Sequence, residues 1–462
     1  MTFDHRKISF WHDSLPERVK PRQALDADTQ VDVAIVGAGY TGLWTAYYLK
    51  QIDPSLNIAV LEAKIAGFGA SGRNGGWCTP HISSIERWLD DPLHKNAALR
   101  LKRLMIETVS EIGRVTKRES IDCHYERSGA LEIAVLPAQL EWLKEEFEHQ
   151  RELGFGDEVY SWLDSDELSQ LIKVDKALAG IRAHQCAVVH PARLARGLAD
   201  CVERAGVKIF EHSPVQTINK NELVCVNARV RADTILLATE GYSAGLSEHK
   251  QRLIPIHSMM VATEPLTQKQ IDELGFSARY TFANSDRVTT YGQLTADNRL
   301  AFGCRGNYLF ASGIQHNFKP NDPEFELVRN TLLRFFPTLQ GVRFTHAWGG
   351  AMGVSRSLRP SVNFDKDRRF GWAGGFFGNG VASTHLAGQT LADLVTDKNS
   401  ERLNTPWVNP THANRHWEPE PLRWLGVHST RTLMGIADRF DYQGGKFGSL
   451  CAKTLDKFMP NL

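Results

Sequence analysis

The 462-residue sequence predicts an α/β protein in which a Rossmann-like domain is joined to an α+β domain built on a mixed sheet. Two observations carry this prediction. A βαβ pattern with a glycine-rich turn occupies residues 31–62, where both strands are short and apolar. Much later, residues 254–264 and 287–304 alternate and contain β-branched residues, which is typical of antiparallel strands. The length agrees with more than one folding unit, because domains average roughly 150 residues.

Composition narrows the class of protein. Lys and Arg number 54 and Asp and Glu 53, so the chain lacks the positive excess of a dedicated nucleic-acid binder. The seven cysteines are dispersed and form no CxxC pair, which disfavours a disulfide framework and a structural zinc site. No signal-peptide pattern and no apolar run of roughly 18 residues is present. We therefore expect a cytoplasmic protein without metal, nucleic-acid partner or transmembrane segment, and the composition leaves its oligomeric state open.

The first elements along the chain are an arm and a βαβ unit. Residues 1–28 are expected to be an extended polar arm, and residues 31–36 form a β-branched strand. Gly37, Gly39 and Gly42 follow in the spacing G-x-G-x-x-G, before a helical stretch and a second strand that ends at Glu62. In this context the first glycine permits a tight turn, the second lets the backbone approach a pyrophosphate, and the third allows close helix packing. Glu62 would accept hydrogen bonds from an adenosine ribose and would repel a 2′-phosphate, so the pattern predicts a dinucleotide other than NADP.

A second glycine-rich block, at 67–76, favours FAD over NAD. An NAD dehydrogenase has no reason to follow its second strand with such a loop, whereas an extended FAD must be threaded and covered. Ser71, Arg73 and Asn74 can donate hydrogen bonds to the pyrophosphate and the flavin edge. The alternative is a mobile surface loop, because clusters of Gly, Ser and Asn are usually loops.

The remaining elements follow from apolar spacing and from turn residues. A glycine-rich entry at 374–380 precedes a helix, whose N-terminus would stabilise the negative charge of a reduced flavin. No second G-x-G-x-x-G unit is present for a nicotinamide cofactor, so the electrons are expected to come from the substrate itself. The other predicted helices are 84–120, 136–151, 193–205, 381–395 and 425–438, and the other predicted strands are 207–210, 234–239 and 370–375.

The motifs resemble those of the D-amino-acid oxidase/glycine oxidase superfamily of FAD-dependent enzymes, and within it the γ-glutamylputrescine oxidase-like amine oxidoreductases. The resemblance covers about residues 28–400 and rests on the segments 37–42, 62–63, 69–76, 238–242 and 378–381, with support from 190–194, 263–266, 294–300 and 348–350. It implies that FAD is held by Gly37, Gly39, Tyr40, Thr41, Gly42, Glu62, Ala63, Ala70, Ser71, Arg73, Asn74, Gly75, Gly76, Val215, Thr239, Gly378, Asn379, Gly380 and Val381.

The resemblance also implies a domain division and a mode of cofactor binding. The topology would be that of glutathione-reductase-like FAD proteins, with a discontinuous FAD-binding domain (28–110, 176–253 and 341–400), a substrate domain (111–175 and 254–340) and a C-terminal tail with a docking helix (401–462). Some relatives bind flavin covalently through a cysteine in the last third of the chain. This sequence has no cysteine between Cys304 and Cys451, so we expect non-covalent FAD. Cys78 is the cysteine that lies near the flavin loop in the sequence.

The function expected from these features is oxidation of a small amine or amino acid at a CH–NH bond. A hydride would pass to flavin N5, and water would hydrolyse the resulting imine to an aldehyde or keto acid plus amine. Candidates for the catalytic face are His257, Tyr291, Arg305 and Trp348. Each also has a plainer interpretation as a packed or solvated side chain.

Several alternatives stay open. The chain could be an FAD-containing tRNA-modifying oxidase, although the balanced charge argues against this, or a non-catalytic flavoprotein. The electron acceptor could be oxygen or a quinone. Primary amines, N-methyl amines, γ-glutamylated polyamines and aminophosphonates are all possible substrates.

Overall fold

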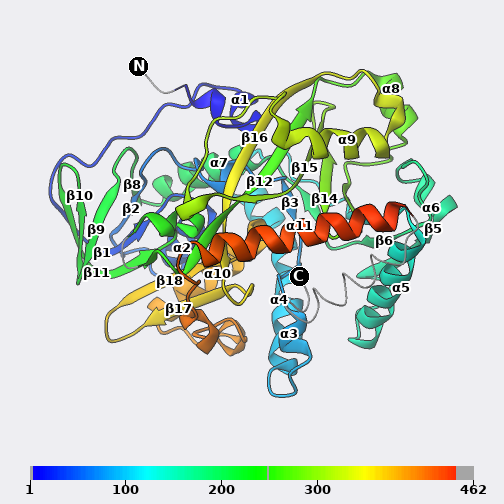
Figure 1. Ribbon diagram of the computed structural model, residues 1–462. Helices are drawn as coiled ribbons and strands as arrows, with labels where there is room; N and C mark the ends of the chain where they lie inside the picture. Colours follow the sequence, from blue (N-terminus) through cyan, green and yellow to red (C-terminus); the bar gives the residue numbers. More distant parts are fainter. Residues whose placement is uncertain (1–3, 247–248, 444–462) are drawn as a thin grey trace.

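Two large sheets organise the chain, and Figure 1 shows them in neighbouring parts of the molecule. The computed structural model describes residues 4–246 and 249–443, and the side chain of Arg305 lies outside its description. Each large sheet has eight strands, and a small sheet pairs β3 (Trp77–Cys78) with β7 (Ala187–Val188). These sheets are the mixed α/β architecture that the sequence predicts.

The first sheet contains the predicted βαβ unit. β1 (Thr29–Val36) pairs in parallel with β2 (Ile58–Leu61) and with β11 (Arg229–Leu237), and α2 (Tyr40–Ile52) connects β1 to β2. The other strands are β8 (Lys208–Phe210), β9 (Val215–Asn219), β10 (Glu222–Cys225), β17 (Ser361–Asp365) and β18 (Phe370–Gly374). The strand order is β17-β18-β11-β1-β2-β8, and the hairpin of β9 and β10 joins through β11.

Helices cover one face of the first sheet. α2 packs there with α4 (Lys95–Arg118), α7 (Pro191–Arg204) and α10 (Gly380–Val395), and their apolar side chains share one core with β1 and β2. A short helix, α3 (Glu86–Leu89), precedes α4. Two residues favour the start of α7. The ring of His190 caps the helix by accepting the N–H of Arg193, and Pro191 occupies the first turn.

The second sheet also contains parallel and antiparallel pairs, and its eight strands follow one continuous order. Its strands are β4 (Ala130–Ala134), β5 (Tyr160–Asp164), β6 (Ala179–Ala183), β12 (Leu253–Thr263), β13 (Thr281–Asn284), β14 (Thr290–Leu294), β15 (Leu300–Tyr308) and β16 (Phe344–Ser355). Their order is β16-β12-β15-β14-β13-β4-β6-β5. The predicted domain bounds group the residues of β6 and β16 with the first domain, whereas both strands pair here.

The two faces of the second sheet are covered differently. α6 (Ser165–Ser169), α8 (Gln268–Leu274) and α9 (Glu326–Phe335) pack on one face around a core of aromatic side chains. α5 (Pro137–Glu152) packs at the end of the other face, where Leu143 and Phe147 contact Ala134 and Ile181. The rest of that second face turns toward the first sheet.

The N-terminal segment is only partly the extended polar arm that the sequence predicts: residues 15–28 contain no helix or strand, but residues 5–13 are folded. A 3-10 turn, His5–Ile8, leads into a short helix, α1 (Phe10–Asp13), and Phe10 and Trp11 are almost completely buried. Trp11 Nε1 donates to the backbone oxygen of Asn74 at 2.7 Å. The prediction was wrong for residues 5–13, because a few large apolar residues in a polar segment show neither the helical nor the strand period.

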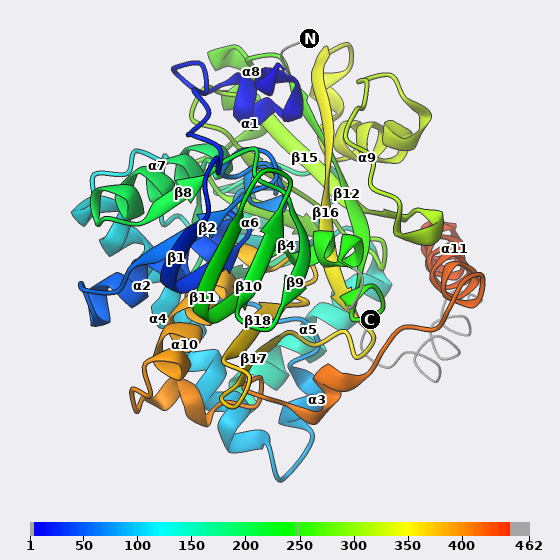
Figure 2. The same ribbon diagram turned by 90° about the vertical axis from the view of Figure 1, so that its left-hand side faces the viewer.

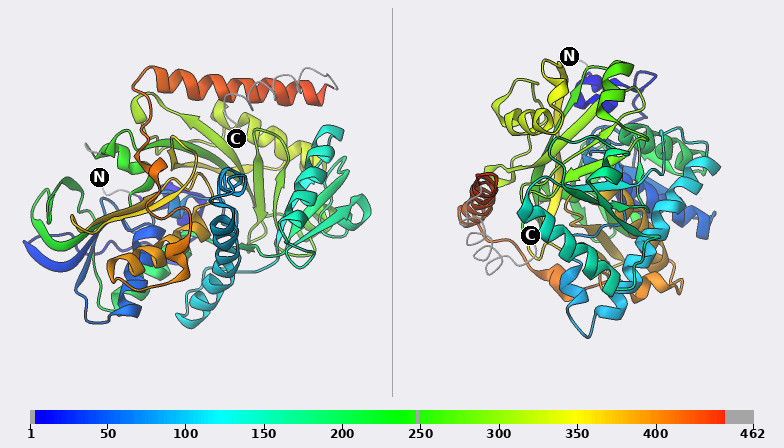
Figure 3. Two further views of the ribbon diagram at one scale, coloured as in Figure 1. Left: turned by 90° about the horizontal axis from the view of Figure 1, so that it is seen from below. Right: turned by 90° about the vertical axis from the view of Figure 1, so that its right-hand side faces the viewer.

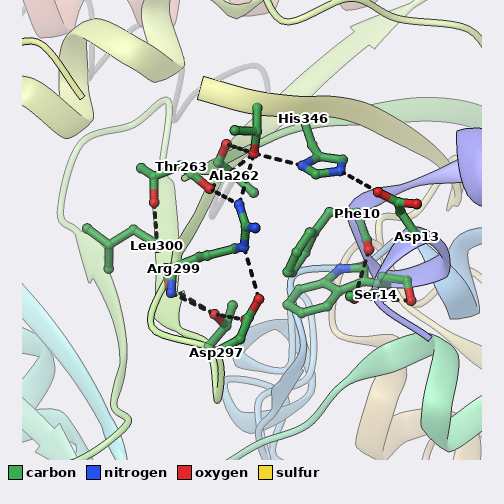
Figure 4. A network of polar contacts seen from close by, with 12 residues as sticks. Phe10, Asp13, Ser14, Ala262, Thr263, Asp297, Arg299, Leu300 and His346 are labelled. Atoms are coloured by element: carbon green, nitrogen blue, oxygen red, sulfur yellow. Dashed lines mark hydrogen bonds and ion pairs between the residues drawn. The ribbon is translucent and has the colours of Figure 1, made fainter. Parts of the chain in front are cut away.

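A polar network fastens this segment to the second sheet, as Figure 4 shows. Arg299, in the turn between β14 and β15, donates to the carbonyl of Thr263 at 2.7 Å, and its guanidinium lies 5.5 Å from the centre of the Phe10 ring. His346 Nε2 lies 3.1 Å from a carboxylate oxygen of Asp13. The first residues of the chain are therefore tied to β12, β15 and β16.

The C-terminal tail contains a long helix, α11 (Leu422–Tyr442), which is wider than the predicted range of 425–438. Figures 2 and 3 show α11 along the side of the second sheet. Trp417 Nε1 donates to the carbonyl of Val354 at 2.8 Å, and Arg287 in the β13–β14 turn lies 3.2 Å from Asp438. Within residues 4–246 and 249–443, no helix is long and apolar enough to cross a bilayer.

Candidate functional site

One cavity of about 1130 Å³ connects the two large sheets. Val36 and Leu61, which end β1 and β2, line one part of it, which we call the turn end. This is the position beyond the carboxyl ends of parallel strands where α/β sheets bind ligands. Glu132, Ala283 and Tyr291 on β4, β13 and β14 line the other part, which we call the sheet end.

Two glycines, one in the turn after β1 and one in the first turn of α2, lie where a side chain has no room. Gly37 has φ +106°, and a β-carbon added there would lie 2.7 Å from the carbonyl oxygen of Ala238. A β-carbon on Gly42 would lie 2.1 Å from the carbonyl oxygen of Gly37. The two glycines therefore let α2 start directly against the strands, with its N-terminus at the cavity.

The N-terminus of α2 offers hydrogen-bond donors to the cavity. The first N–H groups of a helix have no partner within it, and the cap residue Gly39 has no side chain to supply one. The N–H of Tyr40 donates to Ser71 Oγ at 2.9 Å, and Thr41 also lines the cavity. Together with the helix dipole, these groups favour an anion such as a phosphate.

Glu62 closes the turn end. Its carboxylate accepts hydrogen bonds from the N–H of Ala38 and the N–H of Lys64, both at 2.9 Å. Loss of hydration raises the pKa of Glu62 to about 7, and the two N–H groups oppose this rise. A ligand hydroxyl donating to this carboxylate would favour its ionised form, as expected for a ribose site.

A second helix N-terminus reaches the cavity at α10, and Glu240 holds its approach. The Glu240 carboxylate accepts the N–H of Gly375 at 2.9 Å and the N–H of Phe376 at 3.1 Å. Loss of hydration raises the pKa of Glu240 to about 7. This role of Glu240 is not visible in the sequence, because its partners lie 135 and 136 residues away and no local spacing reveals them.

His316 and Tyr242 are two further cavity residues that the sequence analysis missed. Their rings stack with centres 6.2 Å apart and planes 6° from parallel. Loss of hydration and, to a lesser extent, the positive charge of Arg73 lower the pKa of His316 to about 4. His316 is therefore neutral at physiological pH. Neither its Nδ1 nor the Tyr242 hydroxyl has a hydrogen-bond partner in the described part of the chain.

Comparison with known proteins places the chain in a family. The model of the family described as DAO, FAD dependent oxidoreductase, matches residues 32–394. The chain belongs to this family. γ-Glutamylputrescine oxidoreductase of Escherichia coli K12 is 29% identical to this FAD-dependent oxidoreductase over 392 residues, which are 84% of the chain and 88% of the relative.

Two further relatives agree with this assignment. Sarcosine oxidase subunit beta of an Arthrobacter species is 23% identical over 397 residues, 81% of this chain and 89% of the relative. The crystal structure of glycine oxidase from Geobacillus kaustophilus superposes with a TM-score of 0.67 at 20% identity, covering 80% of this chain and 96% of that one. The predicted family resemblance and the predicted FAD-binding fold are confirmed.

The surroundings of Arg73 show whether the site of this FAD-dependent oxidoreductase suits an anionic cofactor. Only 1% of Arg73 is exposed, and its Nε and Nη1 donate to the backbone oxygens of Phe68 and Gly349 at 2.8 and 3.0 Å. Nη2 has no partner, and no carboxylate pairs with this guanidinium among the residues that the structure describes. A buried cation without a counter-charge within the loop 69–76 fits an anionic cofactor such as FAD.

The predicted FAD residues fall into two groups. Those that line the cavity of the oxidoreductase are Gly37, Gly39, Tyr40, Thr41, Glu62, Ala63, Ala70, Ser71, Asn74, Gly75, Val215, Thr239, Gly378, Asn379, Gly380 and Val381. Gly42, Arg73 and Gly76 lie behind this lining. Asn74 lines the cavity, but its side chain is already used within the loop, where Oδ1 accepts the N–H of Gly76 and Nδ2 donates to Ala70.

Two of the predicted catalytic residues, Tyr291 and Trp348, pack against the same apolar cluster, but only Tyr291 lines the cavity. Tyr291 lines the cavity, and a β-carbon on Gly75 would lie 2.7 Å from its ring. His257 is buried behind the wall, where its Nε2 accepts the N–H of Gln315 at 3.0 Å. Trp348 is also buried and donates from Nε1 to the backbone oxygen of Arg73 at 2.8 Å. Arg305 lies on β15, and its side chain is outside the described part.

Proposed function

We propose that this FAD-dependent oxidoreductase oxidises a small amine or amino acid at a CH–NH bond. One observation carries the proposal: a single cavity runs from the turn that fits the dinucleotide to the face of the second sheet. A substrate bound at the sheet end therefore shares one cavity with the cofactor. When bound, FAD supplies at N5 the acceptor for a hydride from the carbon next to the substrate nitrogen, and water then hydrolyses the imine.

The named relatives support the amine class. γ-Glutamylputrescine oxidoreductase, sarcosine oxidase subunit beta and glycine oxidase all carry the name of a compound with a carbon-bound hydrogen next to an amine nitrogen. The sequence also has no second dinucleotide motif, which makes the substrate the source of electrons. Oxygen and a quinone are both compatible acceptors.

The residues in and around the cavity have different proposed roles. Tyr291 contributes its ring to the wall beside Gly75 and is proposed to contact the substrate. Arg73 would stabilise negative charge on the cofactor, and Trp348 positions Arg73 through its backbone oxygen. His257 holds the backbone of Gln315, next to His316, so we assign it a positioning role.

The FAD is proposed to be non-covalent. Cys78 belongs to the buried core behind α2, and burial raises its pKa well above the ordinary range, so its thiolate is disfavoured. Precipitation of the purified holoenzyme with acid should leave all flavin in the supernatant. A yellow pellet after washing would contradict non-covalent binding.

Anaerobic bleaching tests the function directly. The flavin absorbance of the purified protein is followed while primary amines, N-methyl amines and amino acids are added, and air is then admitted. We expect at least one amine to bleach the flavin. Rapid recolouring in air identifies oxygen as the acceptor, and bleaching without recolouring indicates another acceptor. Failure of every amine and amino acid to bleach the flavin would contradict the proposed function.

A further inference from the structure

Carboxylates gather at the sheet end, where α3, α4 and α5 approach the second sheet. Glu86 on α3, Glu132 on β4 and Glu146 on α5 all line the cavity, and Lys102 on α4 is the cation among them. This corner of the cavity therefore holds three carboxyl groups and one ammonium group. Such an arrangement is costly unless a cation compensates it.

Lys102 is already engaged by part of this cluster. Its ammonium donates to Gln150 Oε1 and lies 4.4 Å from the centre of the Phe155 ring. Gln150 in turn donates to Glu146 at 2.6 Å. Loss of hydration lowers the pKa of Lys102 to about 8, although the negative charges of Glu146 and Glu86 oppose this change.

Glu132 is the carboxylate that remains without compensation. Within residues 4–246 and 249–443 its side chain has no hydrogen bond and no ion pair. Loss of hydration and then the charge of Glu146 raise the pKa of Glu132 to about 7. Its neighbour Ile133 points into the opposite core, whereas Glu132 itself lines the cavity.

The sheet fixes how far Glu132 lies from the cofactor side. Glu132 pairs in register with Ala283, and Ala283 pairs with Tyr291, so the three residues form one row across β4, β13 and β14. Two strand spacings separate Glu132 from Tyr291, which is roughly 10 Å. Because Ala283 is small, the floor between them leaves room for an extended chain. Tyr291 contacts Gly75 of the loop that is assigned to FAD.

We propose that Glu132, with Glu146 and Glu86, forms a subsite for a second positive charge on the substrate. The substrate is then an extended amine that is oxidised at one end and carries a cationic group at its other end. This inference rests on the proposed function for the position of the oxidised end, but recognition of the distal cation can be measured by itself. A cation at Glu132 would supply the missing counter-charge and allow the carboxylate to ionise.

Two cations that cannot be oxidised test the subsite in the holoenzyme. 1,4-Diguanidinobutane carries a guanidinium at both ends and butylguanidine at only one, and both stay protonated at neutral pH. Isothermal titration calorimetry should show the dication binding about 10-fold or more tightly than the monocation, because one further charge-assisted contact forms. Glu132→Gln should lose this preference.

Matched variants separate the subsite from a general charge effect. Glu145→Gln removes the same charge from an exposed position on α5 and should leave both affinities unchanged. Glu146→Gln should weaken the preference partly, and it serves as the second variant if Glu132→Gln fails to fold by circular dichroism. Equal affinity of the wild type for both probes, or a full preference in Glu132→Gln, would overturn the subsite.

The outcome for the proposed function is read separately, from flavin bleaching by monoamines and diamines. Bleaching together with equal binding of the two probes would leave amine oxidation standing and remove the distal subsite. A preference for the dication without bleaching by any amine would leave the cation site standing and remove amine oxidation.

Discussion

The turn end and the sheet end of the cavity are built from different parts of the chain. At the turn end the backbone makes the site: Gly37 and Gly42 leave no room for a β-carbon, and helix N–H groups face the ligand. At the sheet end side chains make the site, with Glu132, Ala283 and Tyr291 projecting from neighbouring strands. Almost any substitution of Gly37 or Gly42 would change the backbone of the turn end. A side chain on the face of the sheet can change without altering the strand that carries it.

This difference explains why the family is evident and the substrate is not. A dinucleotide is common to many enzymes of this fold, and the backbone geometry that holds it is restricted to a short glycine spacing. The row from Tyr291 to Glu132 requires three strands to pair in one register, and each residue comes from a separate part of the chain. Substrate choice can therefore vary from relative to relative while the cofactor stays the same.

The largest expected effect is at the turn end, for Gly39→Val. A β-carbon at this position would lie 3.0 Å from Ser71 Oγ, and the added methyl groups would keep a pyrophosphate away from the N-terminus of α2. Losing two charge-assisted contacts should weaken FAD binding about 100-fold or more. The ratio of flavin to protein absorbance measures this loss, and circular dichroism checks that the fold is retained.

Gly426→Val is the matched control for this change. A β-carbon on Gly426 in α11 would meet nothing within 4 Å, so this variant should keep its full flavin content. Full retention of FAD in Gly39→Val would show that the turn end does not bind the cofactor through its backbone.

Glu240→Ala is expected to have the next largest effect. The N–H groups of Gly375 and Phe376 would lose their acceptor, at a cost of about 2–4 kcal/mol in the free energy of unfolding. The entry to α10 would loosen, so FAD binding should weaken together with thermal stability. Differential scanning calorimetry of Glu240→Ala beside Glu148→Ala, an exposed position on α5, measures the change. Equal melting temperatures for the two variants would contradict the role given to Glu240.

The sequence predicts the turn end far better than it predicts the sheet end. Gly37, Gly39, Gly42 and Glu62 belong to one βαβ unit, and the contacts of Gly42 and Glu62 lie within it, so their spacing is visible in the sequence. His316 could not be found, because it has no local pattern. Glu240 lies in the segment 238–242 that carries the family resemblance, but its role was not visible there, because its partners Gly375 and Phe376 come from a distant segment. The buried N-terminal segment was missed for a related reason, since Trp11 acquires its partners only when residue 74 lies beside it.

The pH dependence of stability distinguishes the sheet end through Glu132. Its folded-state pKa of about 7 lies above the ordinary value of 4.5, so its contribution to stability is present below pH 4.5 and is lost as the pH rises through 7. Between pH 5 and pH 8 this loss amounts to about 2 kcal/mol. Glu132→Gln does not titrate, so it should melt at a higher temperature than the wild type at pH 8 and at a similar temperature at pH 5. Glu145→Gln should follow the wild type at both values, and an unchanged difference across the range would contradict the raised pKa.

The smallest effect is expected for Trp11→Phe, which tests whether the N-terminal segment supports one end of the cavity only. The phenyl ring would stay in the core, but the backbone oxygen of Asn74 would lose the N–H that it accepts at 2.7 Å. This costs about 1 kcal/mol, which corresponds to FAD affinity lowered by a factor of about 5 if the loop 69–76 carries the whole loss. Binding of 1,4-diguanidinobutane should not change, since Trp11 does not line the cavity in which Glu132, Glu146 and Glu86 lie. Trp162→Phe on β5 is the control with the same chemical change. If Trp11→Phe weakened the dication as much as the cofactor, the two ends would be coupled through the flavin loop, and their independence would be wrong.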